Sequence, residues 1–396
     1  MNYLQKKKLA FMSIVNKVKG FVRTLIGIPP LTLSNCVDED SLISYKIYGD
    51  SIQNGTPAPD APVEIESVGE YDASTEKYKI PVRARGKNLL QYPYTETTQE
   101  DKGLTFIDNG DGSITVSGVP TGSSQFIFGT IPITGGKKYT LYRIAENESN
   151  IRWYWTFFDA DGTKITEAST LNQIHTLTAP DNAATIKLLV FRGSVGVETS
   201  GTIYPMLLEG AITQADYEPY VEPITTNIYL DEPLRKIGDY ADCVDFENGK
   251  VIRNIKSINA EANGWSSYND GDEKHATKVY RLPIATLVNN YGYHCVCNRF
   301  IGKTRMHIYN GIKGIAANDL QIRLYYVGIT DISIEDFQDW VSENPISVDY
   351  ILSEPIEEDI ELPKLPTFKG TTIYEVDTNI QPSNMEVSYY SSQKGE

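Results

Sequence analysis

The stretch GLTFIDNGDGSITVSGV (residues 103–119) places two alternating apolar runs on either side of a Gly-rich turn. Alternation with a period of two is typical of a strand with one buried face, and Asn-Gly or Asp-Gly between two such runs indicates a β-hairpin. The segment IRWYWTFFDADGTKITE (151–167) repeats this arrangement around another Asp-Gly turn. Because further short strand-like runs continue to residue 222, we expect residues 87–222 to form an antiparallel β-sandwich.

The N-terminal segment has a different period. Its apolar side chains recur every seven residues, at Leu4, Phe11, Val18 and Leu25, and GIPP ends the pattern because proline cannot continue a helix. We therefore predict an amphipathic helix in residues 1–28. So short a helix is marginal alone and needs a partner surface, so we interpret it as an assembly anchor and favour protein over membrane. No A-x-A site follows its short apolar run, which argues against a signal peptide.

Two further β-rich units are predicted, a short anchoring segment at residues 29–86 and a C-terminal domain at residues 223–396. In the first, SIQNGTPAPDAPVEIESVG (51–69) lies between strand-like runs, and its prolines favour a stiff, ordered crossing over a flexible linker. In the second, SIEDFQDWVSENP (333–345) predicts a helix with Ser333 as its N-cap. The predicted fold is therefore mainly β.

A weak internal echo lies within the C-terminal region. IYLDEPL (228–234) and YILSEPI (350–356) are both strand-like and both stop at Glu-Pro. They are either two paired strands of one domain or a degenerate duplication.

Charge is unevenly distributed along the chain. The net charge is −16, yet six basic residues and no acidic one precede Asp38. A basic N-terminal segment therefore precedes an acidic body, and general nucleic-acid binding is disfavoured because affinity for phosphates needs clustered Lys and Arg. The four cysteines are too few and too dispersed for a disulfide framework, which indicates reduced thiols in a protein made in a cytoplasm. No apolar run approaches the roughly 20 residues of a transmembrane helix.

Several of these segments carry a family resemblance. The motif residues of the first are Gly49, Ser51–Gly55, Pro57, Pro59, Pro62 and Gly86–Leu89. Together they resemble the N-terminal segment of tail and baseplate structural proteins of bacteriophages and prophages. LLEGAITQADYEPYVE (207–222) resembles the exit strand of carbohydrate-binding-like jelly rolls in those proteins. LRKIGDYADCVDFENGKVIRNI (234–255) and FKGTTIYEVDTNIQPSNMEVSYY (368–390) resemble their C-terminal domain.

The resemblance implies a non-enzymatic virion protein that is made in the host cytoplasm and assembles with other virion proteins near the host-facing end of a tail. It also implies a jelly-roll-like sandwich in residues 87–222. A trimer is favoured by analogy with tail fibres and by the seven-residue repeat. Three alternatives stay open: a glycan-recognising receptor-binding protein, a head or neck decoration or fibre protein, and a cell-wall polysaccharide hydrolase.

Candidate glycan-binding residues lie in one predicted strand of the sandwich and near it. Trp153 and Trp155 share a strand face, and an exposed indole can stack on the apolar face of a sugar ring. Arg152 or Arg192 would then donate hydrogen bonds to sugar hydroxyls. The competing interpretation places both tryptophans in the core, which is the usual position of dense aromatic residues at strand spacing.

The sequence gives little support for a metal or catalytic site. DNGDGS (108–113) and DADGT (159–163) are similar to calcium loops, but position twelve holds Val119 or Thr170 in place of Glu, so we interpret both as hairpin turns. EPIEEDIELP (354–363) offers carboxylates for the hydrolase alternative, although an acidic solvated edge is the simpler interpretation.

Zinc is also disfavoured. His294, Cys295 and Cys297 lie close together, but no second ligand pair stands at a suitable spacing. We therefore expect no metal, no cofactor and no catalytic residue.

Overall fold

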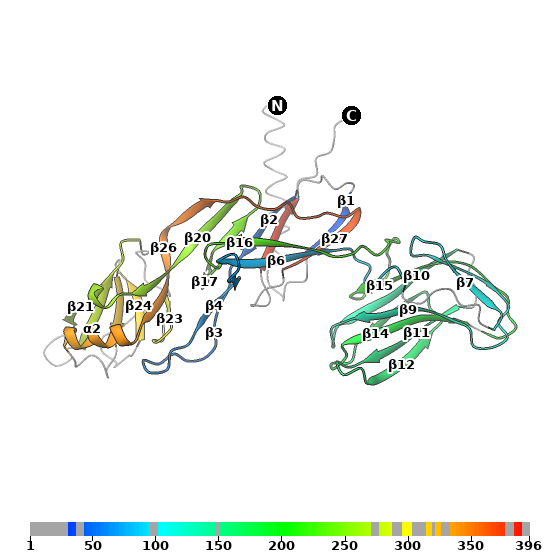
Figure 1. The fold of residues 1–396 in the computed structure, drawn as a ribbon, viewed down its shortest axis with the longest axis horizontal. Coiled ribbons are helices and arrows are strands. Elements are labelled where there is room, and N and C mark those ends of the chain that lie inside the picture. The colour runs from blue at the N-terminus through cyan, green and yellow to red at the C-terminus, as the bar shows by residue number, and fades with distance from the viewer. Residues whose placement is uncertain are drawn as a thin grey trace, which may run out of the picture.

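The computed structural model describes residues 31–36, 43–94, 102–146, 151–192, 194–270, 277–286, 295–302, 314–318, 321–325, 333–376 and 384–389. Within these residues the fold is mainly β, with antiparallel sheets, one α-helix and one short 3-10 helix, so the predicted mainly β class is confirmed. Figure 1 shows three parts along the long axis: a β-sandwich at one end, a small lobe at the other, and a central unit between them. The predicted helix of residues 1–28 lies outside the described residues.

The sandwich consists of two antiparallel sheets around one core. Their strand orders are β13-β10-β15-β8-β7 and β12-β11-β14-β9. The strands are β7 (Leu104–Asp108), β8 (Ile114–Gly118), β9 (Gln125–Pro132), β10 (Lys138–Glu146), β11 (Ile151–Phe158), β12 (Lys164–Thr170), β13 (Ile174–Thr178), β14 (Thr185–Arg192) and β15 (Thr199–Glu209). Inward side chains from both sheets, such as Phe106 of β7 and Phe128 of β9, share a single hydrophobic core.

The strands of the sandwich pair in a nested order. β8 pairs with β15, β9 with β14, β10 with β13, and β11 with β12. The chain from β8 to β15 thus behaves as one long hairpin that is folded over, so that successive nested pairs fall alternately in the two sheets.

The hairpin predicted for residues 103–119 is present as β7–β8. Gly110 and Gly112 in its turn have φ values of +86° and +85°, which glycine adopts without steric cost. Asp108 accepts a hydrogen bond from the Gly110 N–H at 2.9 Å, and Asp111 accepts one from the Ser113 N–H at 2.8 Å. The local turn chemistry therefore explains why the sequence signal was clear.

The central unit holds two sheets, one with order β1-β27-β6-β16 and β5 beside β6, the other with order β23-β26-β20-β19-β2-β28. Its strands include β1 (Leu31–Cys36), β2 (Ile43–Tyr48), β5 (Glu70–Asp72), β6 (Lys77–Arg85), β16 (Ile224–Leu230), β19 (Cys243–Asp245), β20 (Lys250–Ala260), β26 (Ile346–Asp359), β27 (Gly370–Val376) and β28 (Asn384–Tyr389). Tyr45, Ile80, Val251 and Tyr374 lie in the core that both sheets share.

These sheets combine the two units that the sequence separated at residues 29–86 and 223–396. β6 pairs with β16 and β27, and β2 pairs with β19 and β28. The reason is topological: the sandwich is inserted between the paired strands β6 and β16, and the small lobe between the paired strands β20 and β26. Linear sequence order therefore hides a central unit whose strands come from both ends of the chain.

The internal echo has a topological counterpart. β16 ends with the first three residues of the first copy and returns from the sandwich, whereas β26 contains the whole second copy and returns from the small lobe. They pair with different strands, β6 and β20 respectively, so the interpretation of two mutually paired strands is wrong.

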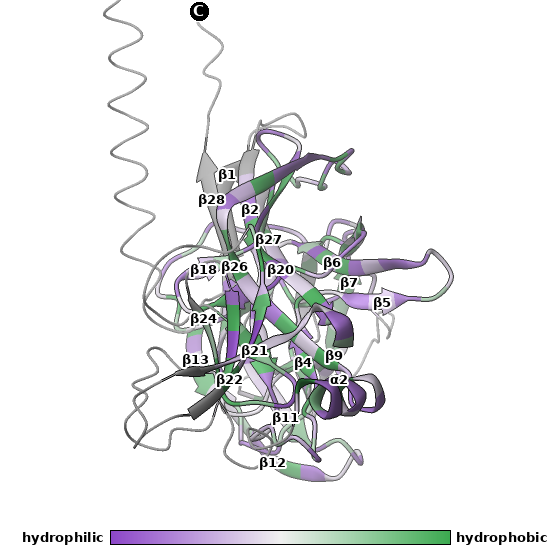
Figure 2. Ribbon diagram, turned by 90° about the vertical axis from the view of Figure 1, so that its left-hand side faces the viewer, coloured by the Kyte–Doolittle hydropathy of each residue, from purple (hydrophilic) through white to green (hydrophobic). Residues whose placement is uncertain are grey.

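The small lobe packs a helix against a four-stranded sheet of order β21-β22-β25-β24. Its elements are the 3-10 helix η1 (Ala262–Gly264), β21 (Ser266–Asp270), β22 (Thr277–Pro283), β24 (Gly314–Asn318), β25 (Gln321–Tyr325) and α2 (Ile334–Glu343). β23 (Cys295–Cys297), the strand of the central sheet that pairs with β26, also contributes its cysteines to the core of this lobe. The ring of Phe337 stacks on Tyr280 at 3.8 Å and fastens α2 to the sheet. Phe337 and Val341 are the buried residues of α2, and Figure 2 shows that much of the remaining helix ribbon is hydrophilic.

The cap predicted for α2 is confirmed. The Ser333 hydroxyl accepts a hydrogen bond from the Asp336 N–H at 3.0 Å and donates one to the Asp336 carboxylate at 2.8 Å. The first bond satisfies an N–H group at the helix start that otherwise lacks an intrahelical partner, and the second links the two side chains of the cap.

The proline stretch forms the loop of a short hairpin, β3 (Ser51–Gln53) with β4 (Ile65–Ser67). The loop also contacts the small lobe, because the Val63 N–H donates to the Asn298 carbonyl at 2.7 Å. One further two-stranded pair, β17 (Lys236–Ile237) with β18 (Tyr240–Ala241), completes the described strands.

Candidate functional site

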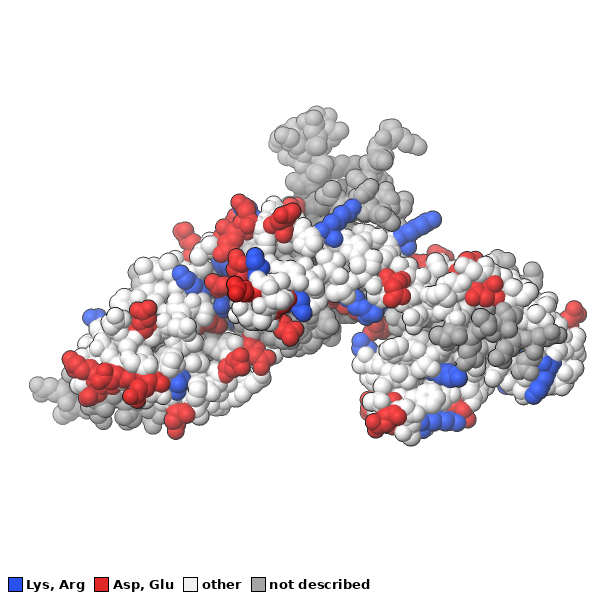
Figure 3. Space-filling view, in the orientation of Figure 1, with Lys and Arg blue, Asp and Glu red and all other residues white. Residues whose placement is uncertain are grey.

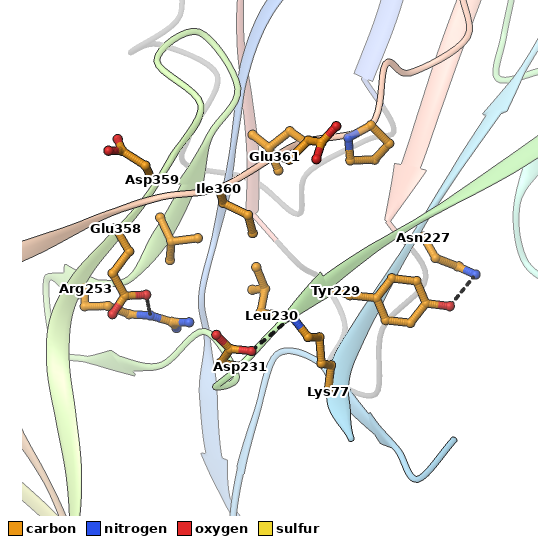
Figure 4. Close-up of a pocket in the computed structure, with 13 residues that line it drawn as sticks. Lys77, Asn227, Tyr229, Leu230, Asp231, Arg253, Glu358, Asp359, Ile360 and Glu361 are labelled. Carbon is orange, nitrogen blue, oxygen red and sulfur yellow. Dashed lines mark hydrogen bonds and ion pairs between the residues drawn. The ribbon is translucent and has the colours of Figure 1, made fainter. Parts of the chain in front are cut away.

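An open groove lies on the central unit between β16 and the segment that follows β26 (Figure 4). It encloses about 690 Å³. Lys77 of β6, residues in and just after β16, Val251 and Arg253 of β20, and residues 358–363 line it. Four segments far apart in sequence thus form one concave surface, which is our candidate site.

The groove follows β16 because of how that strand alternates. Ile228 and Leu230 turn inward and are each 1% exposed, whereas Asn227 and Tyr229 turn outward. β16 is the edge of its sheet among the described strands, so no neighbouring strand covers its outer side. Leu230 and Val251 form the buried floor, and the half-buried Ile360 lies beside them (Figure 4).

Two ion pairs cross the groove lining. Lys77 Nζ lies 3.2 Å from Asp231 Oδ1, and Arg253 Nε lies 3.8 Å from Glu358 Oε2. The Lys77 and Asp231 side chains are 46% and 84% exposed, so water and salt screen their attraction. Both cations of the lining therefore already face a carboxylate.

Arg253 is held by the fold. Its Nη1 donates to the Pro233 carbonyl at 2.7 Å and its Nη2 to the Glu232 carbonyl at 2.9 Å. Nη1 also lies 3.6 Å from the fully buried carboxylate of Asp242. Because these partners occupy most of its donors, Arg253 serves to position the chain around the groove.

Asp242 ties the strands behind the groove together. Its carboxylate accepts hydrogen bonds from the N–H groups of Arg235, Asn254 and Ile255 at 2.8–3.0 Å. Burial raises the pKa of Asp242, while these N–H donors and the charge of Arg253 act in the opposite direction. A buried carboxylate with this many hydrogen-bond partners has a structural role: it links the chain segments that donate to it.

The rim of the groove carries surplus negative charge. Asp359 and Glu361 are exposed and lie on the segment that closes one side of it. The lining holds four carboxylates, of Asp231, Glu358, Asp359 and Glu361, and two cations, of Lys77 and Arg253, so its formal charge is −2. Figure 3 shows acidic side chains gathered over this part of the central unit and, separately, along α2.

The two tryptophans predicted as a glycan platform lie in the core of the sandwich. Trp153 is fully buried and Trp155 is 6% exposed. Trp153 packs against Phe128, with ring centroids 5.7 Å apart. A sugar needs an exposed ring face to stack on, so neither tryptophan forms a surface platform; this corrects the binding interpretation.

The two arginines of that predicted site do not share a face. Arg152 lies opposite Phe191, whereas Arg192 lies opposite Ile151, which belongs to the core. Directly opposed residues of an antiparallel pair lie on the same side of the sheet. Arg152 is therefore on the outer side and Arg192 on the core-facing side, and the predicted constellation does not converge on one ligand.

The predicted assembly residues Leu4, Phe11, Val18 and Leu25 lie outside the described residues. Within the part of the chain that the structure describes, no three His, Cys, Asp or Glu side chains form a group that could hold a metal ion. None of the described helices is long and apolar enough to cross a membrane.

Three cysteines are free thiols. Cys243, Cys295 and Cys297 are all buried. Burial raises the pKa of Cys295 and of Cys297, the latter to about 11, so both are protonated at neutral pH. A protonated, buried thiol is a poor nucleophile and a poor metal ligand.

Sequence reasoning missed the groove and the buried pair behind it. Asp242 and Arg253 lie in the family-like segment 234–255, but nothing in the local sequence pairs them or assigns them a role. The groove walls are brought together only by the insertion of two lobes. The acidic run at residues 354–363 was visible as an exposed edge, but its apolar neighbours on β16 and β20 were not.

Comparisons with known proteins give no family. No protein-family model matches the chain, and no curated protein matches it. A solved structure described as "Crystal structure of accessory secretory protein 1,2 and 3 in Streptococcus pneumoniae" is 18% identical, covers 31% of this chain and 95% of that chain, and has a TM-score of 0.25. A TM-score this low carries no argument.

Proposed function

We propose that this chain is a non-enzymatic structural protein of a bacteriophage or prophage tail or baseplate, which assembles as an oligomer near the host-facing end. The observation that carries the proposal is where the family-like residues lie. Residues 86–89 lie where the central unit meets the sandwich, which we call the sandwich joint. The proline stretch within residues 49–62 contacts residues 297–299, where the central unit meets the small lobe, and we call this contact the lobe joint.

Asn88, from the Gly-Lys-Asn-Leu motif, fastens the joint of the sandwich. Its Oδ1 accepts the N–H groups of Leu90 and Leu207 at 3.0 and 3.1 Å, and its Nδ2 donates to the Glu218 carbonyl at 3.2 Å. The side chain is 4% exposed and connects the chain that enters the sandwich to the chain that leaves it. This favours a role in fixing the lobe's position.

Arg85, directly before that motif, crosses the same joint. Its Nε donates to Glu375 of β27 at 2.8 Å, and its Nη2 lies 3.0 Å from Glu209 of β15. One arginine thus bridges a strand of the central unit and a strand of the sandwich. Since the Arg85 side chain is 5% exposed, its contacts are shielded from solvent.

The proline motif makes hydrogen bonds to the small lobe at the lobe joint. Arg299 Nη1 donates to the Pro59 carbonyl, and Gln53 Nε2 donates to the Cys297 carbonyl at 2.7 Å. Gly49 lies just before the proline motif, between β2 and β3. A Cβ there would stand 2.5 Å from the Arg235 carbonyl oxygen, so only glycine fits this close approach of two backbone segments. Buried and part-buried polar contacts at both joints support a protein whose shape is its function.

The jelly-roll assignment of the sandwich belongs to the same proposal. Its support is the nested pairing of β8 with β15 through β11 with β12, which is the strand arrangement of two Greek keys in a double-sheet jelly roll. Glycan recognition is not carried forward, because the tryptophans assigned to it are buried.

Mass spectrometry of purified tail particles tests the proposal, combined with gold-labelled antibodies against the chain in electron microscopy. We expect the chain in the particles and the gold at the host-facing end. Absence from intact particles would overturn the assignment, and labelling at the head or neck would move it there. Incubation of the purified chain with host cell walls tests the non-enzymatic part, which release of reducing sugars would refute.

A further inference from the structure

We propose that the groove on the central unit binds the basic N-terminal segment, residues 1–28, of a second copy of this chain. The inference deepens the proposed function, on whose self-assembly it rests, by naming the donor and the acceptor of the contact. It stands on three observations: charge, apolar character and the placement of the strands.

Charge complementarity is the first. Residues 1–28 contain six Lys and Arg and no Asp or Glu. The groove lining has a formal charge of −2, and its Asp359 and Glu361 are exposed. A segment of high positive charge is thereby attracted to the rim, and like-charged parts of the acidic body are repelled from it.

Apolar complementarity is the second. Between the acidic side chains the groove offers Leu230, Val251, Ile360 and Leu362. The segment offers an apolar residue at every seventh position from Leu4 to Leu25. Apolar anchors set in a groove with oppositely charged flanks are the pattern by which amphipathic segments are recognised.

The placement of the strands describes the contact that a second copy makes as the donor, and the choice of a second copy rests on the proposed self-assembly. β1, the first strand after the segment, and β16, which borders the groove, are the two opposite edges of one sheet. With three strand spacings between them, the edges are about 14 Å apart. A donor at one edge and an acceptor at the other give a head-to-tail contact, and contacts of this kind close into rings when the rotation between copies permits.

A charge-exchange experiment on the full chain tests the proposal. The groove variant carries Asp359→Lys and Glu361→Lys, the segment variant Lys6→Glu, Lys7→Glu and Lys8→Glu, and a third chain combines all five. We expect each single set to raise the dissociation constant of the oligomer at least about tenfold in mass photometry and analytical ultracentrifugation, and the combined chain to recover most of the loss.

The matched control lies on α2, the other acidic surface. Glu335→Lys with Asp339→Lys makes the same charge change at two exposed positions of the small lobe and is expected to leave assembly unchanged. An equal loss in this control, no loss in the groove variant, or no recovery in the combined chain would each overturn the proposal. So would a wild-type chain that stays monomeric at every concentration.

A cross-link identifies the copy that donates the segment. One tagged chain carries Lys7→Cys and a differently tagged chain carries Glu361→Cys, and the two are mixed under mild oxidation. A disulfide between the two tags is expected. A failure to form it, or a disulfide within one chain that carries both changes at high dilution, would overturn the second-copy assignment. Detection of the chain in tail particles does not depend on either result, so the proposed function is judged separately.

Discussion

At the scale of single residues, Asn88 is the side chain on which the sandwich joint depends most directly. Replacing it by Ala leaves the N–H groups of Leu90 and Leu207 without their acceptor in a buried site. We expect Asn88→Ala to lower the free energy of unfolding by about 2–3 kcal/mol in chemical denaturation. Asn54→Ala is the matched control, because exposed Asn54 makes one bond to Glu66 and its loss is expected to cost less than about 0.5 kcal/mol. Equal effects would refute the role of Asn88.

Asp111 in the β7–β8 turn gives a pH-dependent prediction. Hydrogen bonds from the Ser113 hydroxyl and N–H hold the pKa of Asp111 below its ordinary value of 3.8. Because the folded chain binds this proton less readily than the unfolded chain, the contribution is present above the unfolded pKa and is lost as pH falls through the folded one. We expect Ser113→Ala to reduce the dependence of unfolding on pH between about pH 5 and pH 2.

The control for this prediction is Ser117→Ala, an exposed serine in β8. It is expected to leave the pH dependence as in the parent chain. A slope that does not change in Ser113→Ala would show that Asp111 has no linkage to folding, whatever the variant does to stability at neutral pH.

At the scale of elements, the cap of α2 has a measurable value. Ser333→Ala removes the acceptor of the Asp336 N–H, and we expect the stability of the helix to fall by about 1 kcal/mol. Hydrogen exchange of the α2 amides measures this loss as faster opening. Ser342→Ala, in the last turn, removes a bond to the Gln338 carbonyl and leaves the cap intact. Unchanged exchange at the helix start in Ser333→Ala would contradict the assignment.

The elements also show what can be read from sequence. The β7–β8 hairpin and α2 were predicted because their signals are local: turn glycines, a capping serine and an apolar period. The pairing of β6 with β27 was not predictable. Arg85 pairs with Ile373, 288 residues later in the chain, and no local pattern encodes so distant a partner. Alternation placed Trp153 and Trp155 on one face, but it could not say which face is inside.

The groove is unpredictable for the same reason. Its walls are strand edges that meet only after two lobes have been inserted, and its acidic rim looks like an ordinary solvated edge in the sequence. The negative charge of residues 357–361 was visible in the sequence. The apolar floor of the groove comes from β16 and β20, whose residues the sequence assigned to no site. The groove was therefore not predicted because its walls come from segments that are distant in sequence, and no single residue marks it.

At the scale of the whole molecule, the nested insertions determine which parts can fold alone. Every buried residue of the sandwich core lies between Leu90 and Leu207, inside residues 87–222. The strands of residues 29–86 instead depend on β16, β19, β27 and β28, all of which come after residue 223. The two fragments are therefore expected to behave oppositely, although both were assigned as units from sequence.

We expect the isolated fragment 87–222 to show a strand-rich circular dichroism spectrum, dispersed amide resonances and one cooperative thermal transition, because it keeps its core and the Asn88 bonds. Fragment 29–86 is expected to lack cooperative unfolding, since β2 and β6 lose the partners that bury Ile47 and Ile80. Adding residues 223–396 in trans should restore order to it if the shared sheets provide its stability. A 29–86 fragment that folds alone would show that the central unit is not a product of both chain ends, and the insertion account of the fold would then fail.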